Sequence, residues 1–245
     1  MKNLIYLFAV LLAVGCNKPD APDCFQSSGK DASEVRIFDG AVKKIEHFDL
    51  IDVVLVPGDE NSCVVKAPSN LMPEIITSFN NGVLTIENKN TCNFVRSYKK
   101  DFIVEVQVGP EFNAYQFEGQ GNVTCTDTLS LESMEMEVYT ASGDVDLWLN
   151  AEEVKCFNHT GVANLRFVGN AESAEWFHQG FGTFDASSLR AETVLSNSNS
   201  VNRLRLFANS YLYAVIQASG NVYYRGNPEV IDLDRSGEGE LLPIN

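Results

Sequence analysis

The chain has 245 residues, of which 44% are hydrophobic, so it can bury a sizeable core as one large β domain or two small domains. Its 33 acidic and 18 basic residues give a formal charge of −15. This charge argues against nucleic acid or an anionic bilayer as the main partner, because phosphates are bound by basic surfaces. It is typical of a well-solvated surface that attracts divalent cations weakly.

The first residues have the pattern of a secretory signal peptide. Lys2 precedes an apolar run over residues 4–12, which is shorter than the roughly 20 residues of a membrane span. Small residues lead to Gly15 and Cys16, so we predict a signal peptide over residues 1–15. Glycine before cysteine resembles the lipobox of bacterial lipoproteins, although Ala13 stands where leucine is usual. The resemblance implies that Cys16 carries a lipid anchor. A plain signal peptide cut near Gly15 is the alternative.

Residues 16–34 are predicted to be a flexible, lipid-anchored tether, since they hold Pro19, Pro22 and small polar residues and have no apolar period. Asn17 follows the cysteine, where some bacteria use aspartate to retain lipoproteins in the inner membrane. Its presence favours an exported outer-membrane lipoprotein. Whether the domain faces the periplasm or the cell surface is left open.

The chain has further cysteines at positions 24, 63, 92, 125 and 156. An exported protein meets oxidising conditions, so we expect the pairs Cys63–Cys92 and Cys125–Cys156, with at least one thiol unpaired. Buried free thiols are the alternative. The spacing C-x-x-C is absent, so the sequence predicts neither a redox centre nor a zinc site.

Residues 35–245 have the pattern of a single all-β domain. Short runs rich in β-branched residues, such as 48–56 and 102–108, end at glycine and proline. Asn81-Gly82 signals a tight turn. Residues 71–79 allow only a short helix, because they contain Pro73 and several β-branched residues. A helical period is absent elsewhere.

A short phrase recurs at a fixed step, and repeats are clearest over residues 117–240. Its copies are Ala151-Glu152, Ala171-Glu172 and Ala191-Glu192, so the step is 171 − 151 = 20 residues. Glycine turns such as Ser142-Gly143-Asp144-Val145 and Ser219-Gly220-Asn221-Val222 run beside it. A repeat of this length indicates stacked supersecondary units.

We therefore predict a β-solenoid or β-helix-like stack preceded by N-terminal strands. Phe157 then stands on Phe177, and Val154 lies near Ala174 and Val194. An antiparallel sandwich or barrel is the alternative. The stack makes a like-charge column of Glu152, Glu172 and Glu192, which is tolerable if these side chains are solvated at a turn or share cations. Open ladder ends favour a homo-oligomer unless they are capped, and Leu241-Leu242-Pro243 is the candidate cap.

The order and spacing of several motifs resemble one bacterial family, the putative auto-transporter adhesins with a head GIN domain. These motifs are Val53-Val54-Leu55, Asn81-Gly82-Val83-Leu84-Thr85-Ile86, the glycine turns, residues 222–228 and Ser236-Gly237-Glu238-Gly239. The resemblance covers residues 35–240. It implies an exported protein with a solenoid-like fold and no known catalytic activity, and it transfers no functional residues. We expect different turn geometry at Thr160-Gly161-Val162 and Ser198-Asn199-Ser200, which depart from the motif.

Residues for catalysis or metal binding are not brought together by the pattern. Asp144 and Asp146 share one strand face, as do Asp232 and Asp234, and we interpret both pairs as solvated. The three histidines are His47, His159 and His178. We expect His47 to be solvated or to cap a strand, and the other two to lie on neighbouring coils with opposite orientations. The sequence thus predicts no catalytic residue, metal site or cofactor.

Exposed aromatic residues are the only hint of a binding surface. Trp148 is out of phase with Val145, Leu147 and Leu149, so it points away from their core. We name Trp148, Tyr139 and Tyr223 as candidate ligand contacts. Cover by a neighbouring segment is the alternative.

These observations predict a non-enzymatic, exported, lipid-anchored protein that acts as an adhesin or interaction module by binding a glycan or a protein. A carbohydrate-active β-helix enzyme is the first alternative, and it requires acids and bases clustered in one groove. A purely structural envelope protein is the second alternative, and the absence of any exposed aromatic or apolar patch would favour it.

Overall fold

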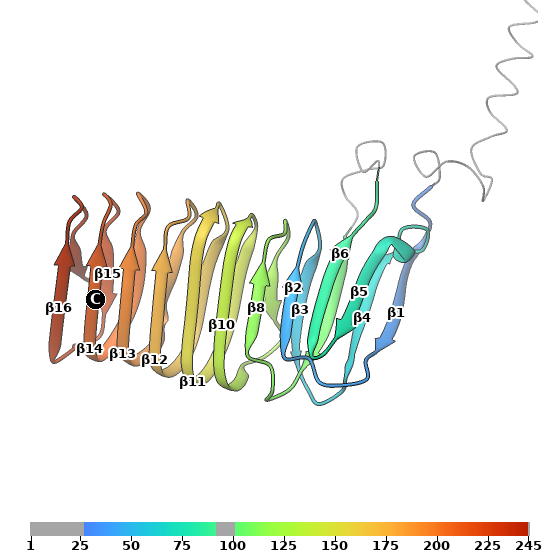
Figure 1. Cartoon of the computed structure of the whole chain (residues 1–245), viewed down its shortest axis with the longest axis horizontal. Coiled ribbons are helices and arrows are strands. Elements are labelled where there is room, and N and C mark those ends of the chain that lie inside the picture. Colours follow the sequence, from blue (N-terminus) through green and yellow to red (C-terminus); the bar gives the residue numbers. More distant parts are fainter. Residues whose placement is uncertain (1–26, 92–100, 245) are drawn as a thin grey trace, which may run out of the picture.

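The computed structural model describes residues 27–91 and 101–244 of the chain. It is a β-solenoid in which successive coils stack along one axis (Figure 1), which confirms the predicted fold class. The predicted signal peptide, the lipid site at Cys16, most of the tether, and Cys24 and Cys92 lie outside the described residues. Within those residues, no helix is long and apolar enough to cross a membrane.

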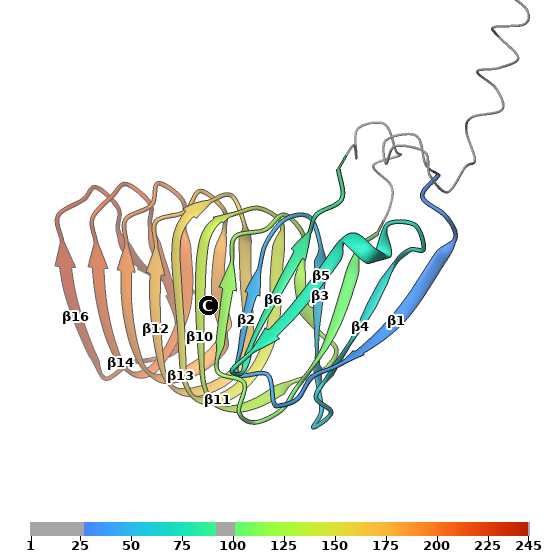
Figure 2. The ribbon, with the colours of Figure 1, turned by 45° about the vertical axis from the view of Figure 1, so that its right-hand side comes forward.

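Each coil contributes one strand to each of two facing ladders, which we call sheet I and sheet II. In order, sheet I contains β5 (Ile75–Asn80), β6 (Val83–Asn88), β2 (Lys44–His47), β8 (Ala114–Phe117), the C-terminal halves of β10 (Leu129–Ala141), β11 (Asp144–Gly161), β12 (Asn164–His178), β13 (Phe184–Ser198) and β14 (Leu204–Ile216), and β16 (Val230–Arg235). Sheet II contains β1 (Asp31–Ile37), β4 (Ser62–Pro68), β7 (Ile103–Val108), β3 (Asp52–Pro57), β9 (Val123–Cys125), the N-terminal halves of β11 to β14, β15 (Val222–Arg225) and β17 (Leu241–Pro243). The long strands β11 to β14 bend from sheet II into sheet I (Figure 2).

The sequence repeat is the parallel register of these coils. Phe157 pairs with Phe177, and Val154 pairs with Ala174, which pairs with Val194. These pairs confirm the predicted stacking. Ala191 pairs with Ala208, a step of 208 − 191 = 17 residues, so the coils shorten after β13. This shortening is why the repeat fades in the sequence after residue 194.

Strand alternation fills the space between the sheets with apolar side chains. Val145, Leu147 and Leu149 point inward from sheet II and are buried. Phe167, Trp176 and Phe184 pack their rings at 5.4–5.8 Å between centroids. The predicted column of Glu152, Glu172 and Glu192 lies at the exposed corner, so it is solvated as expected.

Close stacking of the backbone requires glycine at particular places. Gly169 has φ +128°, and a Cβ there would lie 1.9 Å from the Leu149 carbonyl oxygen. Gly143 in the predicted turn has φ +119°. The turn after β13 has no glycine, and the Ser200 hydroxyl instead donates to the Gly180 carbonyl at 2.6 Å. This side-chain contact occurs at Ser198-Asn199-Ser200, where the glycine of the other turns is missing.

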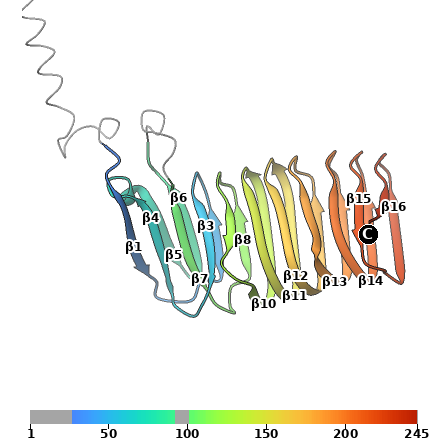
Figure 3. The same ribbon diagram turned by 180° about the vertical axis from the view of Figure 1, so that it is seen from behind.

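The two ends of the solenoid differ. Antiparallel pairing of β5 with β6 and of β1 with β4 closes the N-terminal end (Figure 3). The only helical element there, among the described residues, is a 3₁₀ turn over Met72–Glu74. Strand β1 begins at Asp31, a few residues before the expected start of the domain. At the other end Leu241-Leu242-Pro243 pairs with β15 in the ladder rather than capping it, and Ile231 and Leu233 of β16 stay exposed.

Two expectations about single residues are wrong. Cys125 and Cys156 are free thiols, because Cys125 lies in sheet II and Cys156 is buried beneath sheet I. Cys63 is also free and buried, and burial raises its pKa to about 11. His47 is fully buried rather than solvated or capping, since β2 is an internal strand between β6 and β8.

Candidate functional site

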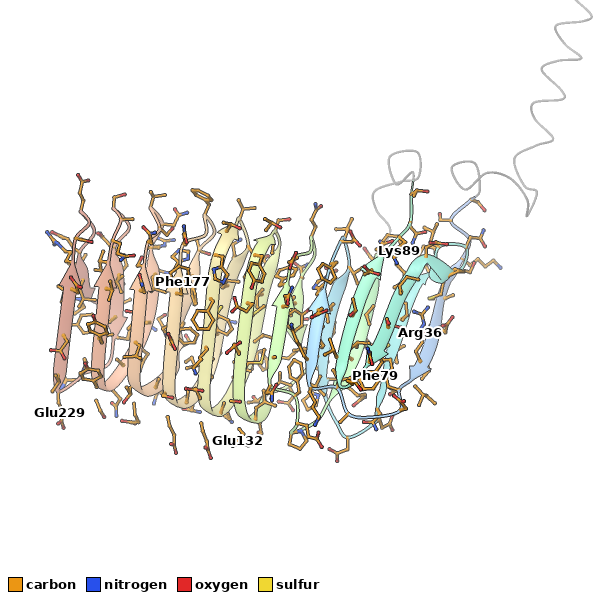
Figure 4. All side chains as sticks on the ribbon, viewed as in Figure 1. Arg36, Phe79, Lys89, Glu132, Phe177 and Glu229 are labelled. Carbon is orange, nitrogen blue, oxygen red and sulfur yellow. The ribbon has the colours of Figure 1, made fainter. Side chains whose placement is uncertain are left out.

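The outer face of sheet I carries a band of aromatic and apolar side chains that runs obliquely across the coils, which we call the aromatic strip. Its members are Tyr139, Phe157, His159, Phe177, Leu195 and Tyr213. Phe157 lies between the buried Cys156 and Asn158, so strand alternation turns it outward. Parallel register then places Phe177 beside it on β12, as Figure 4 shows for the labelled Phe177.

Ring contacts order the first part of the strip. Tyr139 stacks on His159 with centroids 4.9 Å apart and an interplanar angle of 10°. His159 also contacts the Phe177 ring at 5.6 Å, and its Nε2 lies 2.5 Å from the Glu137 carboxylate. These contacts hold the rings in place before a ligand binds, so the side chains lose little conformational entropy on binding.

The strip continues towards the C-terminal end of the solenoid. Leu195 and Tyr213 pair in register and are 41% and 36% exposed, against 37% for Tyr139. Tyr211 lies beside them and donates its hydroxyl to Asp232 at 2.9 Å. Several adjacent coils therefore expose aromatic and apolar surface, which marks a contact site more strongly than any single exposed residue.

The outer face of sheet II is different, because charged side chains form a ladder across it. Arg166 donates to both carboxylate oxygens of Asp146 at 2.8 Å, and Arg205 donates to Asp185 at 3.3 Å. Trp148 stands beside this ladder and is 42% exposed, as its phase in the strand predicts.

The structure separates the three predicted contact residues. Tyr139 lies on sheet I, whereas Trp148 and Tyr223 lie on sheet II. Strands β12 to β14 stand between Trp148 on β11 and Tyr223 on β15. Sequence reasoning missed Phe157 and Phe177 as surface residues, although their alternation with Val154 and Cys156 carried the signal.

Potential catalytic groups are engaged in structural contacts. His178 points inward beside Asn158, with Nδ1 3.3 Å from the amide nitrogen, and burial lowers its pKa to about 4. His159 points outward, as expected. Asp144 accepts a hydrogen bond from Asn164 at 2.9 Å. In the described part of the chain, no three His, Cys, Asp or Glu residues form a group that could hold a metal ion.

A shallow hollow near the N-terminal coils has a volume of about 230 Å³ and is lined partly by Asp59, Glu60 and Glu111. Ligand pockets for small molecules typically exceed about 300 Å³. The sheet faces are therefore better suited to an extended ligand lying flat than this hollow is to a small one.

The chain belongs to the family described as "putative auto-transporter adhesin, head GIN domain", which matches residues 41–228. This confirms the family expected from the sequence. No curated protein is significantly similar to the chain in sequence.

Solved structures share the fold. A putative adhesin from Bacteroides fragilis superposes with a TM-score of 0.78 at 19% identity, covering 88% of this chain and 97% of its own. A putative adhesin and a putative lipid binding protein from Parabacteroides distasonis each give a TM-score of 0.63 at 18% identity. The first of these covers 88% of this chain and 98% of its own, and the second 87% and 97%.

Proposed function

We propose that this protein is a non-enzymatic, lipid-anchored adhesin that binds glycan chains through the aromatic strip of sheet I. The observation that carries the proposal is the strip itself, which exposes aromatic and apolar rings on adjacent coils. Aromatic faces are apolar and carry a negative quadrupole, so they stack on the C–H face of a sugar ring.

The shape of the surface supports a chain-like ligand. Equivalent side chains on neighbouring coils repeat every ~4.8 Å along the solenoid axis. A polymer that crosses the coils obliquely would pass from Tyr139 through Phe177 to Tyr213, because these residues lie on three neighbouring rows of the sheet. Acidic neighbours such as Glu137 and Asp232 favour a neutral glycan over an acidic one at this face.

The location in the proposal rests on the family and the N-terminus. The adhesin description supports an exported or cell-surface protein. Gly15 and Cys16 supply the lipobox-like junction, so we assign lipid attachment to Cys16 and place the protein at the outer membrane. The described domain then stands on a tether that enters at β1, the closed N-terminal end.

Enzymatic activity is not part of the proposal. A glycosidase needs two carboxylates that flank the scissile bond inside a groove, whereas the carboxylates that line the shallow hollow, Asp59, Glu60 and Glu111, are all solvent-exposed. Asp146 and Asp185 each face an arginine, which stabilises the sheet. A protein partner remains the second candidate ligand, and the exposed Leu195 within the strip favours it.

A glycan array tests the proposal. The mature chain would be screened as wild type, as the double variant Phe157→Thr/Phe177→Thr, and as Trp148→Thr, which removes an exposed ring from the opposite sheet. Threonine keeps the strand propensity at all three positions. We expect wild-type binding to at least one neutral glycan, lost in the double variant and kept in Trp148→Thr. Binding that survives the double variant, with matching thermal unfolding, would contradict the assignment of the strip.

A further inference from the structure

We infer that a second binding site, on the outer face of sheet II, takes an acidic polysaccharide chain that carries carboxylates. The site is a cluster that we call the arginine patch. Its members are Arg190, Arg203, Arg205, Arg225, Phe207 and Tyr223. It lies on the sheet opposite to the aromatic strip, so the inference does not depend on the proposed glycan site there.

The backbone of β14 builds the patch. Leu204 and Leu206 are fully buried, so the alternating Arg205 and Phe207 point outward from sheet II, and exposed Arg203 precedes them. Parallel register sets Tyr223 beside Arg205 and Arg225 beside Phe207. The arginines and rings thus alternate on two neighbouring coils.

The preceding coil adds a fourth arginine. The guanidinium carbon of Arg190 lies 5.7 Å from the centre of the Phe207 ring, which is a cation–π distance. This contact is possible because the shortened coil pairs Ala191 with Ala208 and so brings the middle of β13 next to Phe207. Arg190 is exposed in this position.

The charge of the patch opposes that of the chain. Four arginines gather here although the formal charge of the protein is −15. The acidic neighbours include Asp185, which accepts from Arg205 at 3.3 Å, and Glu240 on the last coil. Glu192, two residues from Arg190, is a further acidic neighbour, and it accepts hydrogen bonds from Asn209 and Ser210. An anionic ligand would therefore find a local positive field on an otherwise acidic protein.

The residue types select the chemistry of the ligand. The planar guanidinium fork matches a carboxylate through two parallel N–H···O bonds. Tyr223 offers a ring beside Arg205 for the sugar units that carry those carboxylates, whereas Phe207 holds the Arg190 guanidinium over its face. A polyuronate supplies both features, whereas the overall negative charge opposes long polyanions with a higher charge density, such as nucleic acid.

The test measures binding of oligogalacturonate by isothermal titration calorimetry with the mature chain. Its fully methyl-esterified form serves as the matched neutral ligand. The variant Arg190→Gln/Arg203→Gln removes two charges from the patch. The control variant Lys155→Gln/Arg235→Gln removes two positive charges from strands of sheet I. The patch variant and the control variant therefore have equal net charge.

We expect the oligogalacturonate to bind the wild type and the control variant equally, and the patch variant at least about tenfold more weakly. The methyl ester should not bind, and Arg190→Lys/Arg203→Lys should recover only part of the affinity because lysine lacks the fork. Equal losses in patch and control variants would overturn the inference, as would binding of the ester or tighter binding of an oligodeoxynucleotide. Variants of the aromatic strip should leave oligogalacturonate binding unchanged. The test of the arginine patch and the test of the aromatic strip can therefore fail independently.

Discussion

Acid should destabilise the domain through two buried histidines. His47 and His178 are fully buried, and desolvation lowers the pKa of each from 6.5 to about 4. His47 Nδ1 lies 3.0 Å from the Tyr115 hydroxyl, and its ring stacks on Phe117 at 4.8 Å. The folded state therefore holds both rings neutral, whereas the unfolded chain protonates them below pH 6.5.

The sign and size follow from this difference. The stabilisation is complete above pH 6.5 and is lost as the pH falls from 6.5 towards 4, because the unfolded state binds more protons in that window. For a pKa of about 4 in the fold, the loss at pH 4.5 is about 2 kcal/mol for each histidine.

Urea denaturation at pH 7.0 and pH 4.5 measures the effect. The wild type would be compared with His178→Asn, which places asparagine where the preceding coil has Asn158, and with His159→Asn on the surface. Carboxylate titration is common to all three proteins. We expect His178→Asn to lose about 2 kcal/mol less stability on acidification than the other two. An equal loss in His178→Asn and the wild type would refute the reasoning.

Three further predictions concern single positions. Gly169→Ala should lower the free energy of unfolding by about 2 kcal/mol or more in urea titrations, since its Cβ would meet a backbone oxygen at 1.9 Å and φ is +128°. Gly58→Ala should lower this free energy much less, because its Cβ meets only a flexible glutamine side chain. Equal losses of stability in the two variants would contradict the stacking argument. Cys156 should resist iodoacetamide at pH 8 in the native protein and react only after unfolding, because burial raises its pKa; mass spectrometry that finds rapid native labelling would refute its burial. Cys16→Ser should abolish incorporation of labelled palmitate and move the protein from the membrane to the soluble fraction, and unchanged membrane association would exclude a lipid anchor at this residue.

Much of the fold was predictable because the register between stacked coils equals the spacing of the sequence repeat. The step between Ala151 and Ala171 is the register of β11 on β12, and the paired phenylalanines repeat it. The alternation along each strand also predicted which side chains point outward, as the exposed Trp148 shows. These features depend only on local alternation and a fixed repeat.

Long-range pairing decided the features that sequence reasoning missed. The segment around His47 reads like any short strand, and its burial results from β6 and β8 lying on either side of it. Cys125 and Cys156 belong to different sheets, which their spacing in the sequence does not reveal. The contact of Arg190 with Phe207 depends on a coil shortened to 17 residues between Ala191 and Ala208, which the 20-residue step does not reveal.

The two opposite faces of the solenoid are suited to different ligands. Sheet I offers aromatic rings with acidic neighbours, and sheet II offers arginines with aromatic neighbours. A protein with both sites would bridge a neutral and an acidic glycan chain. The solenoid fixes the distance between these chains because its core is continuous from end to end.

Carbene footprinting of the mature protein tests the central claim most directly. The protein would be labelled with and without its best neutral glycan ligand, and modification would be mapped residue by residue by mass spectrometry. We predict protection of Tyr139, Phe177 and Tyr213 on sheet I, with Trp148 on sheet II labelled equally in both samples. Protection of Trp148 without protection of the three strip residues would contradict the assignment of sheet I as the glycan-binding face.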